Sequence, residues 1–349
     1  MEFYECVSYV IEKMRAFQEE ILIDCNENAE AVLVEALNTN LKLDFYFAGV
    51  EAFVDPVTRK VKVKVQYRNK EVPTSQVIVL TKEADATPKL SQTMGNYGDR
   101  LVIVAPKEKN IDPMKIYSTI NDYLIGYYPD LENCAIYDMS NALVNIYDFR
   151  LKYRLSLEQL SKMNEEVTAE VKRVAGLLFK PYMPDYVKIF LAHNYLCVNT
   201  EYYLMENADA YERAYRQSAY GALIMKKCVC QGYADAFQKL MEEAKIESDI
   251  VCGQILGDSE YHAWNVVSLN GGEDNFHIDI TWDDVTQKPT YRYFGKSDLD
   301  LSGERMWNKA YTFKCRSDKN LLEMARHYVS VNRFKLIGDK VPLNVLNLM

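Results

Sequence analysis

Three residue types that together can carry out nucleophilic catalysis occur in the order Cys230, His262 and Asp279. Downstream of Cys230, apolar residues recur at the three- and four-residue spacing of a buried helix face, so a helix is predicted to begin near this cysteine. A thiol at a helix N-terminus lies at the positive end of the helix dipole, which favours the nucleophilic thiolate form. Since a cysteine at a helix start is more often structural, this position alone indicates a nucleophile only weakly.

The histidine and the aspartate flank a strong hairpin signal, Asn270-Gly271-Gly272. A two-residue loop at Gly271-Gly272 places His262 diagonal to Asp279, and a loop one residue earlier places the two directly opposite. In either register both side chains project from one face of the sheet, within reach of a cross-strand pair. A loop with an odd number of residues would separate them. The spacing therefore lets Asp279 orient the His262 ring, although each residue taken alone would be interpreted as structural.

Three segments in the same order carry a family resemblance: Cys230–Ala234 (CQGYA), His262–Asn265 (HAWN) and His277–Asp284 (HIDITWDD). They resemble the core motifs of the transglutaminase-like superfamily, most closely those of its bacterial members. The resemblance covers roughly residues 185–310. It implies a papain-like α+β fold, in which a helix bearing the cysteine packs against an antiparallel sheet bearing the histidine and the aspartate.

The resemblance also implies a mechanism. Cys230 would attack a carboxamide or peptide carbonyl, His262 would pair with the thiolate and protonate the leaving amine, and Asp279 would fix the imidazole tautomer. The acyl group would pass to an amine, giving a crosslink, or to water, giving hydrolysis. The resemblance implies no cofactor and no metal, and it implies a protein or peptide substrate. Within and beside these motifs, the side chains expected to contact the substrate are Gln231, Tyr233, Trp264 and Trp282.

Other interpretations stay open. The domain can be a cysteine protease or amidase without crosslinking activity, or a non-catalytic scaffold that binds proteins. A zinc site built from Cys230, His262 and His277 is disfavoured, because Cys228-Val229-Cys230 lacks the C-x₂-C spacing of structural zinc sites. Cys228 itself can be inert or can form a regulatory disulfide.

The elements that must position these residues lie in the C-terminal part of the chain. We expect residues 156–349 to form the catalytic domain, with a helix-rich half followed by a strand-rich half. Residues 1–155 are expected to form a separate α+β region. Within it, residues 20–70 and 100–155 share a predicted strand–helix–strand–strand order, which indicates either a repeat or coincidence, because such units are common.

Composition limits the remaining function classes. The 349 residues are 48% hydrophobic and 26% charged with a net charge of −9, which is typical of a globular protein and unlike one that binds nucleic acid. No apolar run is long enough to span a membrane. Eight cysteines spread along the chain are expected to be mainly reduced. The charged first 20 residues leave no secretory segment, so we expect a cytoplasmic protein, or a surface or secreted one if a leader precedes the native chain. The oligomeric state cannot be inferred.

Overall fold

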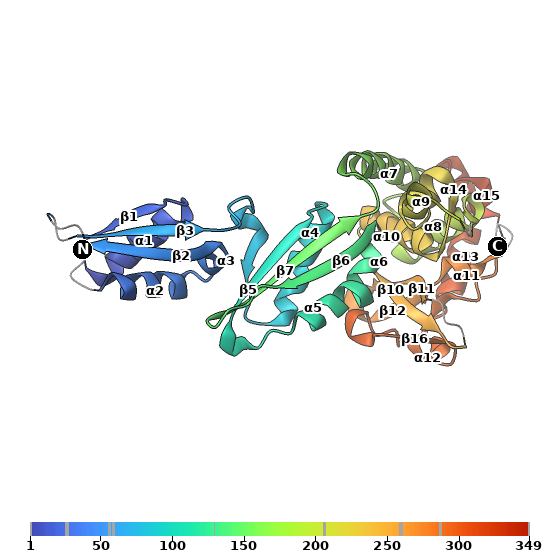
Figure 1. Ribbon diagram of the computed structural model, residues 1–349. Helices are drawn as coiled ribbons and strands as arrows, with labels where there is room; N and C mark the ends of the chain where they lie inside the picture. The colour runs from blue at the N-terminus through green and yellow to red at the C-terminus, as the bar shows by residue number, and fades with distance from the viewer. Residues whose placement is uncertain are drawn as a thin grey trace. The chain divides into compact units, whose positions relative to one another are not determined.

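The computed structural model describes residues 2–24, 28–54, 57, 60–128, 130–204, 207–257, 261–285 and 288–347. Cys25, one of the cysteines expected to be reduced, lies outside the described residues. The chain divides into two compact units, Met1–Ser118 with Asn133–Lys152, and Thr119–Glu132 with Tyr153–Met349. The predicted boundary at residue 155 is close to Tyr153, where the longer segment of the second unit begins. Residues 119–132, however, fold with the second unit although they precede that boundary in the sequence (Figure 1).

The first unit begins with a three-stranded antiparallel sheet in the order β1-β3-β2, packed against helices. Alternation is visible in its central strand, where Val63 and Val65 are buried and Lys62 and Lys64 are exposed, because successive side chains of a strand point to opposite faces. The elements are α1 (Phe3–Arg15), β1 (Glu20–Ile23), α2 (Ala29–Thr39), α3 (Lys42–Tyr46), β2 (Phe47–Val54) and β3 (Val61–Tyr67).

A second sheet of the order β4-β5-β7-β6 follows in the chain. Three of its strands, β5-β7-β6, repeat the order β1-β3-β2, and α4 and α5 precede the same strands as α1 and α2. The shared element order is a structural finding, whereas sequence duplication stays a prediction. The elements are η1 (Thr74–Gln76), β4 (Val77–Val79), η2 (Glu83–Asp85), α4 (Ala86–Gly95), β5 (Arg100–Pro106), η3 (Lys107–Lys109), α5 (Pro113–Thr119), β6 (Leu131–Asp138) and β7 (Val144–Tyr153).

Helices make up the first part of the second unit and also its C-terminal end. α8 (Asp185–Asn199) lies at its centre, since all side chains from Ile189 to Cys197 are buried and the helix packs against α10, α13 and α15. Ser156 caps α7 as its sequence predicts, with the hydroxyl accepting from the Gln159 N–H. The other helices are η4 (Ile120–Leu124), α6 (Ile125–Tyr127), α7 (Leu157–Leu178), α9 (Ala210–Arg216), η5 (Gly221–Met225), α10 (Cys230–Ala244), α13 (Leu321–Val331), α14 (Arg333–Gly338) and α15 (Leu343–Leu346).

Between α10 and α13 the chain forms a five-stranded antiparallel sheet in the order β15-β12-β11-β10-β16. Helix α10 packs against β10 and β11, so the predicted α+β arrangement of a cysteine-bearing helix on an antiparallel sheet is confirmed. The strands are β10 (Glu247–Ile255), β11 (Tyr261–Leu269), β12 (Asp274–Ile278), β15 (Phe294–Lys296) and β16 (Arg305–Trp307). Shorter elements are β8 (Glu201–Tyr202), β9 (Lys227–Cys228), η6 (Asn270–Gly272), α11 (Ile280–Asp283), β13 (Asp284–Val285), β14 (Lys288–Pro289), α12 (Asp298–Leu301) and η7 (Lys309–Tyr311).

Across the described ranges, no helix combines the length and the apolar character needed to cross a membrane.

The first turn of α10 is pressed against the chain that precedes it. A Cβ atom on Gly232 would lie 2.6 Å from the Cβ of Cys228 and 2.7 Å from the backbone oxygen of Arg216. The Val229 N–H also donates to the Arg216 oxygen, so the same backbone group holds the residue before the helix. Position 232 therefore requires glycine, because the preceding chain approaches it too closely for a Cβ atom. This close packing fixes the start of α10 and with it the position of Cys230.

We predict that Gly232→Ala lowers the free energy of unfolding by about 1–3 kcal/mol, because the added methyl group overpacks a backbone contact. Gly176→Ala is the matched control, since Gly176 also lies within a helix but a Cβ atom added there would meet nothing within 4 Å. The control should raise the free energy of unfolding by about 0.5–1 kcal/mol, because alanine favours helices. Urea denaturation measures both, and equal stability of the two variants would contradict the close approach.

Candidate active site

The β11–β12 hairpin sets the relation between His262 and Asp279. In its register Asn265 pairs with Ile278 and Leu269 pairs with Asp274. The loop therefore has four residues rather than the two predicted, and it includes a 3₁₀ turn with left-handed conformations at its centre. Four is still an even number, so the register equals that of a loop at Gly271-Gly272. Both side chains consequently project from one face.

Asp279 differs from its predicted place within a strand. β12 ends at Ile278, and Asp279 is the N-cap of α11, where its Oδ1 accepts from the Trp282 N–H at 3.2 Å. Its Oδ2 lies 2.7 Å from Nε2 of His262. The carboxylate is 1% exposed and the histidine 7% exposed. Because Nε2 of His262 faces Asp279, Nδ1 is the ring nitrogen that remains available to interact with the Cys230 thiol.

The electrostatics favour a protonated ring. Burial is the largest influence on His262 and opposes its charge, but the charge of Asp279 and hydrogen bonds with Asp279 and Cys230 together raise its pKa to about 9. Burial likewise opposes ionisation of Asp279, yet the charges of His262 and Arg305 outweigh it together and hold the pKa of this carboxyl below its usual value. A buried imidazolium–carboxylate pair results.

Cys230 is the first residue of α10 and is half-buried. It opens onto a pocket of about 430 Å³, which it shares with His262. Every lining residue belongs to the second unit: Asn121, Arg154, Gln217, Val229, Cys230, Gln231, Cys252, Tyr261, His262 and Ala263. Cys228 is buried, and burial raises the pKa of its thiol well above the usual value.

The four side chains expected to contact substrate lie in different surroundings. Gln231 lines the pocket, and its amide donates to the Gly126 oxygen at 2.5 Å. Tyr233 and Trp264 are each only 1% exposed and are bonded to Asp284 and His277, so both support the site from within the core instead of facing a substrate. Trp282 is half-buried, with its ring centre 5.7 Å from that of His262.

Residues 119–132 contribute to the site although the sequence assigned them to the N-terminal region. Besides the Gly126 contact, the Tyr127 hydroxyl donates to Asp249 at 2.6 Å and accepts from the Ile250 N–H at 3.1 Å. These bonds fix the segment to β10 beside the pocket. Sequence reasoning missed them because they join positions more than 100 residues apart.

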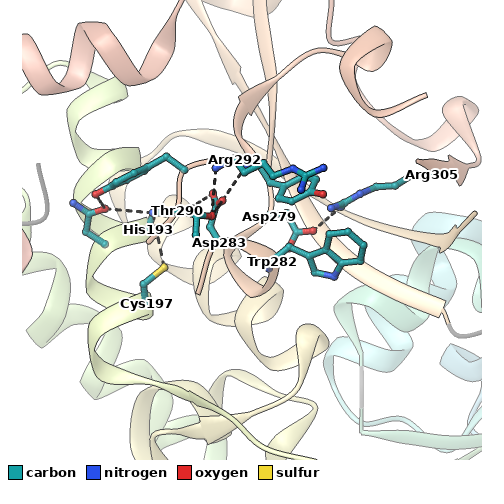
Figure 2. A network of polar contacts seen from close by, with 11 residues as sticks. His193, Cys197, Asp279, Trp282, Asp283, Thr290, Arg292 and Arg305 are labelled. Carbon is teal, nitrogen blue, oxygen red and sulfur yellow. Dashed lines mark hydrogen bonds and ion pairs between the residues drawn. The ribbon is translucent and has the colours of Figure 1, made fainter. Parts of the chain in front are cut away.

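Arg305 is a further residue of the site that the sequence did not reveal. Figure 2 shows its guanidinium pointing at Asp279, and Nη1 lies 2.5 Å from Oδ2. The residue comes from β16, the edge strand beside β10, which lies outside the three motifs. A single arginine between a glutamate and a methionine has no pattern that would mark it.

A second set of cysteine, histidine and aspartate lies in the core (Figure 2). His193 Nε2 is 3.1 Å from Asp283 Oδ2, and the Cys197 sulfur is 4.0 Å from His193 Nδ1. All three side chains are fully buried, and burial raises the pKa of the Cys197 thiol well above its usual value. Asp283 also accepts from Thr290 at 2.9 Å. This set therefore ties α8 to α11 and is not open to a substrate.

One cluster of the described residues has the composition of a metal site: His277, Asp298 and Cys315, whose ligand atoms lie within 4.8 Å of one another. The indole N–H of Trp264 donates to Nδ1 of His277 at 3.0 Å, so Nε2 carries the ring proton and donates to Asp298 at 2.9 Å. A protonated Nε2 has no lone pair for a metal. The cluster of His277, Asp298 and Cys315 therefore does not fit a zinc ion.

Comparison with known proteins finds a family match for the segment that contains the candidate catalytic residues. Residues 172–280 match the model of the transglutaminase-like superfamily, and Cys230, His262 and Asp279 lie within that range. None of the curated proteins compared with the sequence matches it. Similar solved structures include a candidate cysteine protease from Cytophaga hutchinsonii, at 13% identity, 43% of this chain, 62% of that chain and a TM-score of 0.27. A TGase structure is 15% identical over 80% of each chain, with a TM-score of 0.30.

The chain thus spans less than two thirds of the first of these two structures. Both likenesses are to proteins of low identity, and the family match rests on the sequence segment that bears the three motifs. Residues 172–280, the segment that bears Cys230, His262 and Asp279, therefore match the transglutaminase-like superfamily.

Proposed function

We propose that this protein is a cysteine enzyme that acts on carboxamide or peptide bonds, with Cys230 as nucleophile, His262 as general acid and base, and Asp279 as the group that orients the ring. The observation that carries the proposal is the buried His262–Asp279 pair, 2.7 Å apart, on a pocket that Cys230 also lines. A protonated ring beside a thiol at a helix start stabilises the thiolate.

In the first half-reaction, the Cys230 thiolate adds to the carbonyl carbon and forms a C–S bond. The oxyanion is stabilised by the backbone N–H of Cys230, which as a first-turn donor has no acceptor within its helix. His262 then gives its Nδ1 proton to the leaving nitrogen, the C–N bond breaks, and a thioester remains on Cys230. Asp279 stays ionised and keeps the ring in place.

In the second half-reaction, water or an amine attacks the thioester carbon while His262 accepts the proton of the nucleophile. The C–S bond breaks, and the thiolate and the imidazolium are restored. Attack by water completes hydrolysis, and attack by an amine completes a transfer or a crosslink. The chemistry on the protein is the same for both acceptors, so the acceptor must be found by experiment.

We predict that Cys230 reacts rapidly with iodoacetamide from about pH 6 to about pH 8, where the raised pKa of His262 keeps the ring charged. As the pH rises through about 9, the His262 ring loses its proton and the ion pair with the Cys230 thiolate ends. The rate of Cys230 labelling should therefore depart from its plateau near this pH. In His262→Ala the rate near pH 6 should fall by about tenfold or more, because an ordinary thiol ionises near pH 8.5.

Cys252→Ser is the matched control for this labelling, since Cys252 lines the same pocket but precedes no matching motif. Peptide mass mapping should find the label on Cys230 in this control at the wild-type rate. Equal rates for the wild type and His262→Ala at pH 6 would mean that no ion pair exists.

A second prediction concerns turnover. Incubation with a glutamine-containing peptide and a fluorescent primary amine should give amine incorporation, or else ammonia or cleaved peptide if water is the acceptor. Cys230→Ala and His262→Ala should each lose about 10³-fold in rate, because triad residues act as a unit. Cys228→Ala keeps the pocket and should retain activity, since Cys228 is buried away from it.

Rapid labelling of Cys230 without any product, over a panel of such peptides, would refute catalysis on carboxamides and favour the scaffold interpretation.

A further inference from the structure

The Arg305 side chain is fully buried at the edge of the sheet that carries the site. Its strand pairs with β10, with Arg305 opposite Ile255. Nη1 lies 2.5 Å from Oδ2 of Asp279, the same oxygen that His262 Nε2 contacts at 2.7 Å. One carboxylate oxygen is therefore shared between the proposed acid–base residue and a permanent cation.

Three aromatic rings surround this guanidinium. Its central carbon lies 4.9 Å from the ring centre of Trp264 and 4.7 Å from those of Trp282 and Tyr293. Such a cage desolvates the cation and supplies cation–π attraction. Burial of a charge costs several kcal/mol unless a partner offsets it. Asp279 is that partner, so the two groups depend on each other.

Arg305 directs its charge at Asp279 through a single ion pair. Nη1 lies at ion-pair distance from Oδ2 of Asp279, and Nε and Nη2 have no hydrogen-bond partner among the described residues. A purely structural arginine would be expected to use several of its five N–H groups on backbone or side-chain acceptors. Here the aromatic cage leaves the charge directed at one carboxylate.

The total charge of this cluster affects how tightly His262 holds its proton. With an imidazolium–thiolate pair, the cluster of Cys230, His262, Asp279 and Arg305 is neutral in total. Without Arg305 it would hold one excess negative charge in a buried site, and that charge would bind the His262 proton more tightly. The proposed reaction needs His262 to release this proton to the leaving nitrogen, and general acids that hold the proton too strongly are slow.

We propose that Arg305 is a positioning residue that fixes Asp279 and weakens the hold of this carboxylate on the His262 proton, so that the ring can act as a general acid. This inference rests on the proposed function and adds a fourth residue to its site. The role is electrostatic and acts through Asp279, without contact to the substrate.

Several other charged or titratable groups among the described residues pack near this cluster. Asp283 of α11 is bonded to His193. Burial, the largest influence on His277 of β12, lowers its pKa, so it stays neutral beside Asp298. Glu304 accepts from the Tyr293 hydroxyl and pairs with the exposed Arg292, and burial raises the pKa of Tyr293 and of Cys197 on α8. Cys230 on α10 is part of the mechanism, and Arg154 lines the same pocket, where its Nε has no hydrogen-bond partner among the described residues.

The test compares Arg305→Met, which keeps a long apolar side chain in the cage, with Arg305→Lys, which keeps the charge. Iodoacetamide labelling of Cys230 and turnover are measured from about pH 5 to about pH 10. The alkaline limit is the pH above which turnover falls because His262 has lost its proton. In Arg305→Met this limit should move upward by about one pH unit, and kcat should fall by about tenfold with KM little changed. Arg305→Lys should keep the wild-type limit.

Arg292→Met is the matched control. Arg292 also stacks on Tyr293, at 5.3 Å, but it is exposed and paired with Glu304. Water should screen its charge, so its alkaline limit should equal that of the wild type. An unchanged limit in a folded Arg305→Met, or the same loss of kcat in the methionine and lysine variants without any shift, would overturn the electrostatic role.

If Arg305→Met does not fold, the pair can be removed together in Asp279→Asn/Arg305→Met, which leaves no buried unpaired charge. The His262 limit in this double variant should lie below that of the wild type, and in Asp279→Asn alone it should be lower still, because Arg305 is then unopposed. Equal limits in these two variants would overturn the inference. Failure of the proposed function is distinct, since it would appear as slow labelling of wild-type Cys230 that His262→Ala does not alter.

Discussion

The candidate active site depends on one buried carboxylate. Asp279 accepts from His262, lies against Arg305 and caps α11 through the Trp282 N–H. These contacts join β11, β16 and the first turn after β12, so the sheet must hold all three in register for the carboxylate to be satisfied. A carboxylate that is 1% exposed would be costly without such partners. The orientation of the proposed general acid therefore follows from the same contacts that stabilise the sheet.

Buried histidine–aspartate pairs recur in this fold with different consequences. Three of the four histidines, His193, His262 and His277, each contact an aspartate within 3.1 Å. Around His193 a cysteine is present as well, but both side chains are fully buried, whereas His262 faces the pocket that holds Cys230. His277 accepts from Trp264, which stacks on His262. Access, more than residue type, separates the proposed catalytic set from those that hold the core together.

Much of the site could be predicted because its signals are local. The apolar spacing after Cys230 marks a helix start, and the glycine-rich turn with an even loop sets His262 and Asp279 on one face. Arg305 and residues 119–132 could not be predicted, since they reach the site only through long-range packing. The motif residues Tyr233 and Trp264 were assigned to substrate contact, yet they fill the core, because a motif mixes catalytic and supporting positions. Resemblance alone does not distinguish these two uses.

The most direct test of the account is the charge state of the His262 ring, measured by nuclear magnetic resonance of protein labelled with ¹⁵N in histidine. The account predicts that both ring nitrogens carry protons at pH 7, with a titration midpoint at about pH 9. A neutral ring at pH 7, with its midpoint at or below the ordinary value of about 6.5, would contradict the imidazolium that the proposed mechanism requires.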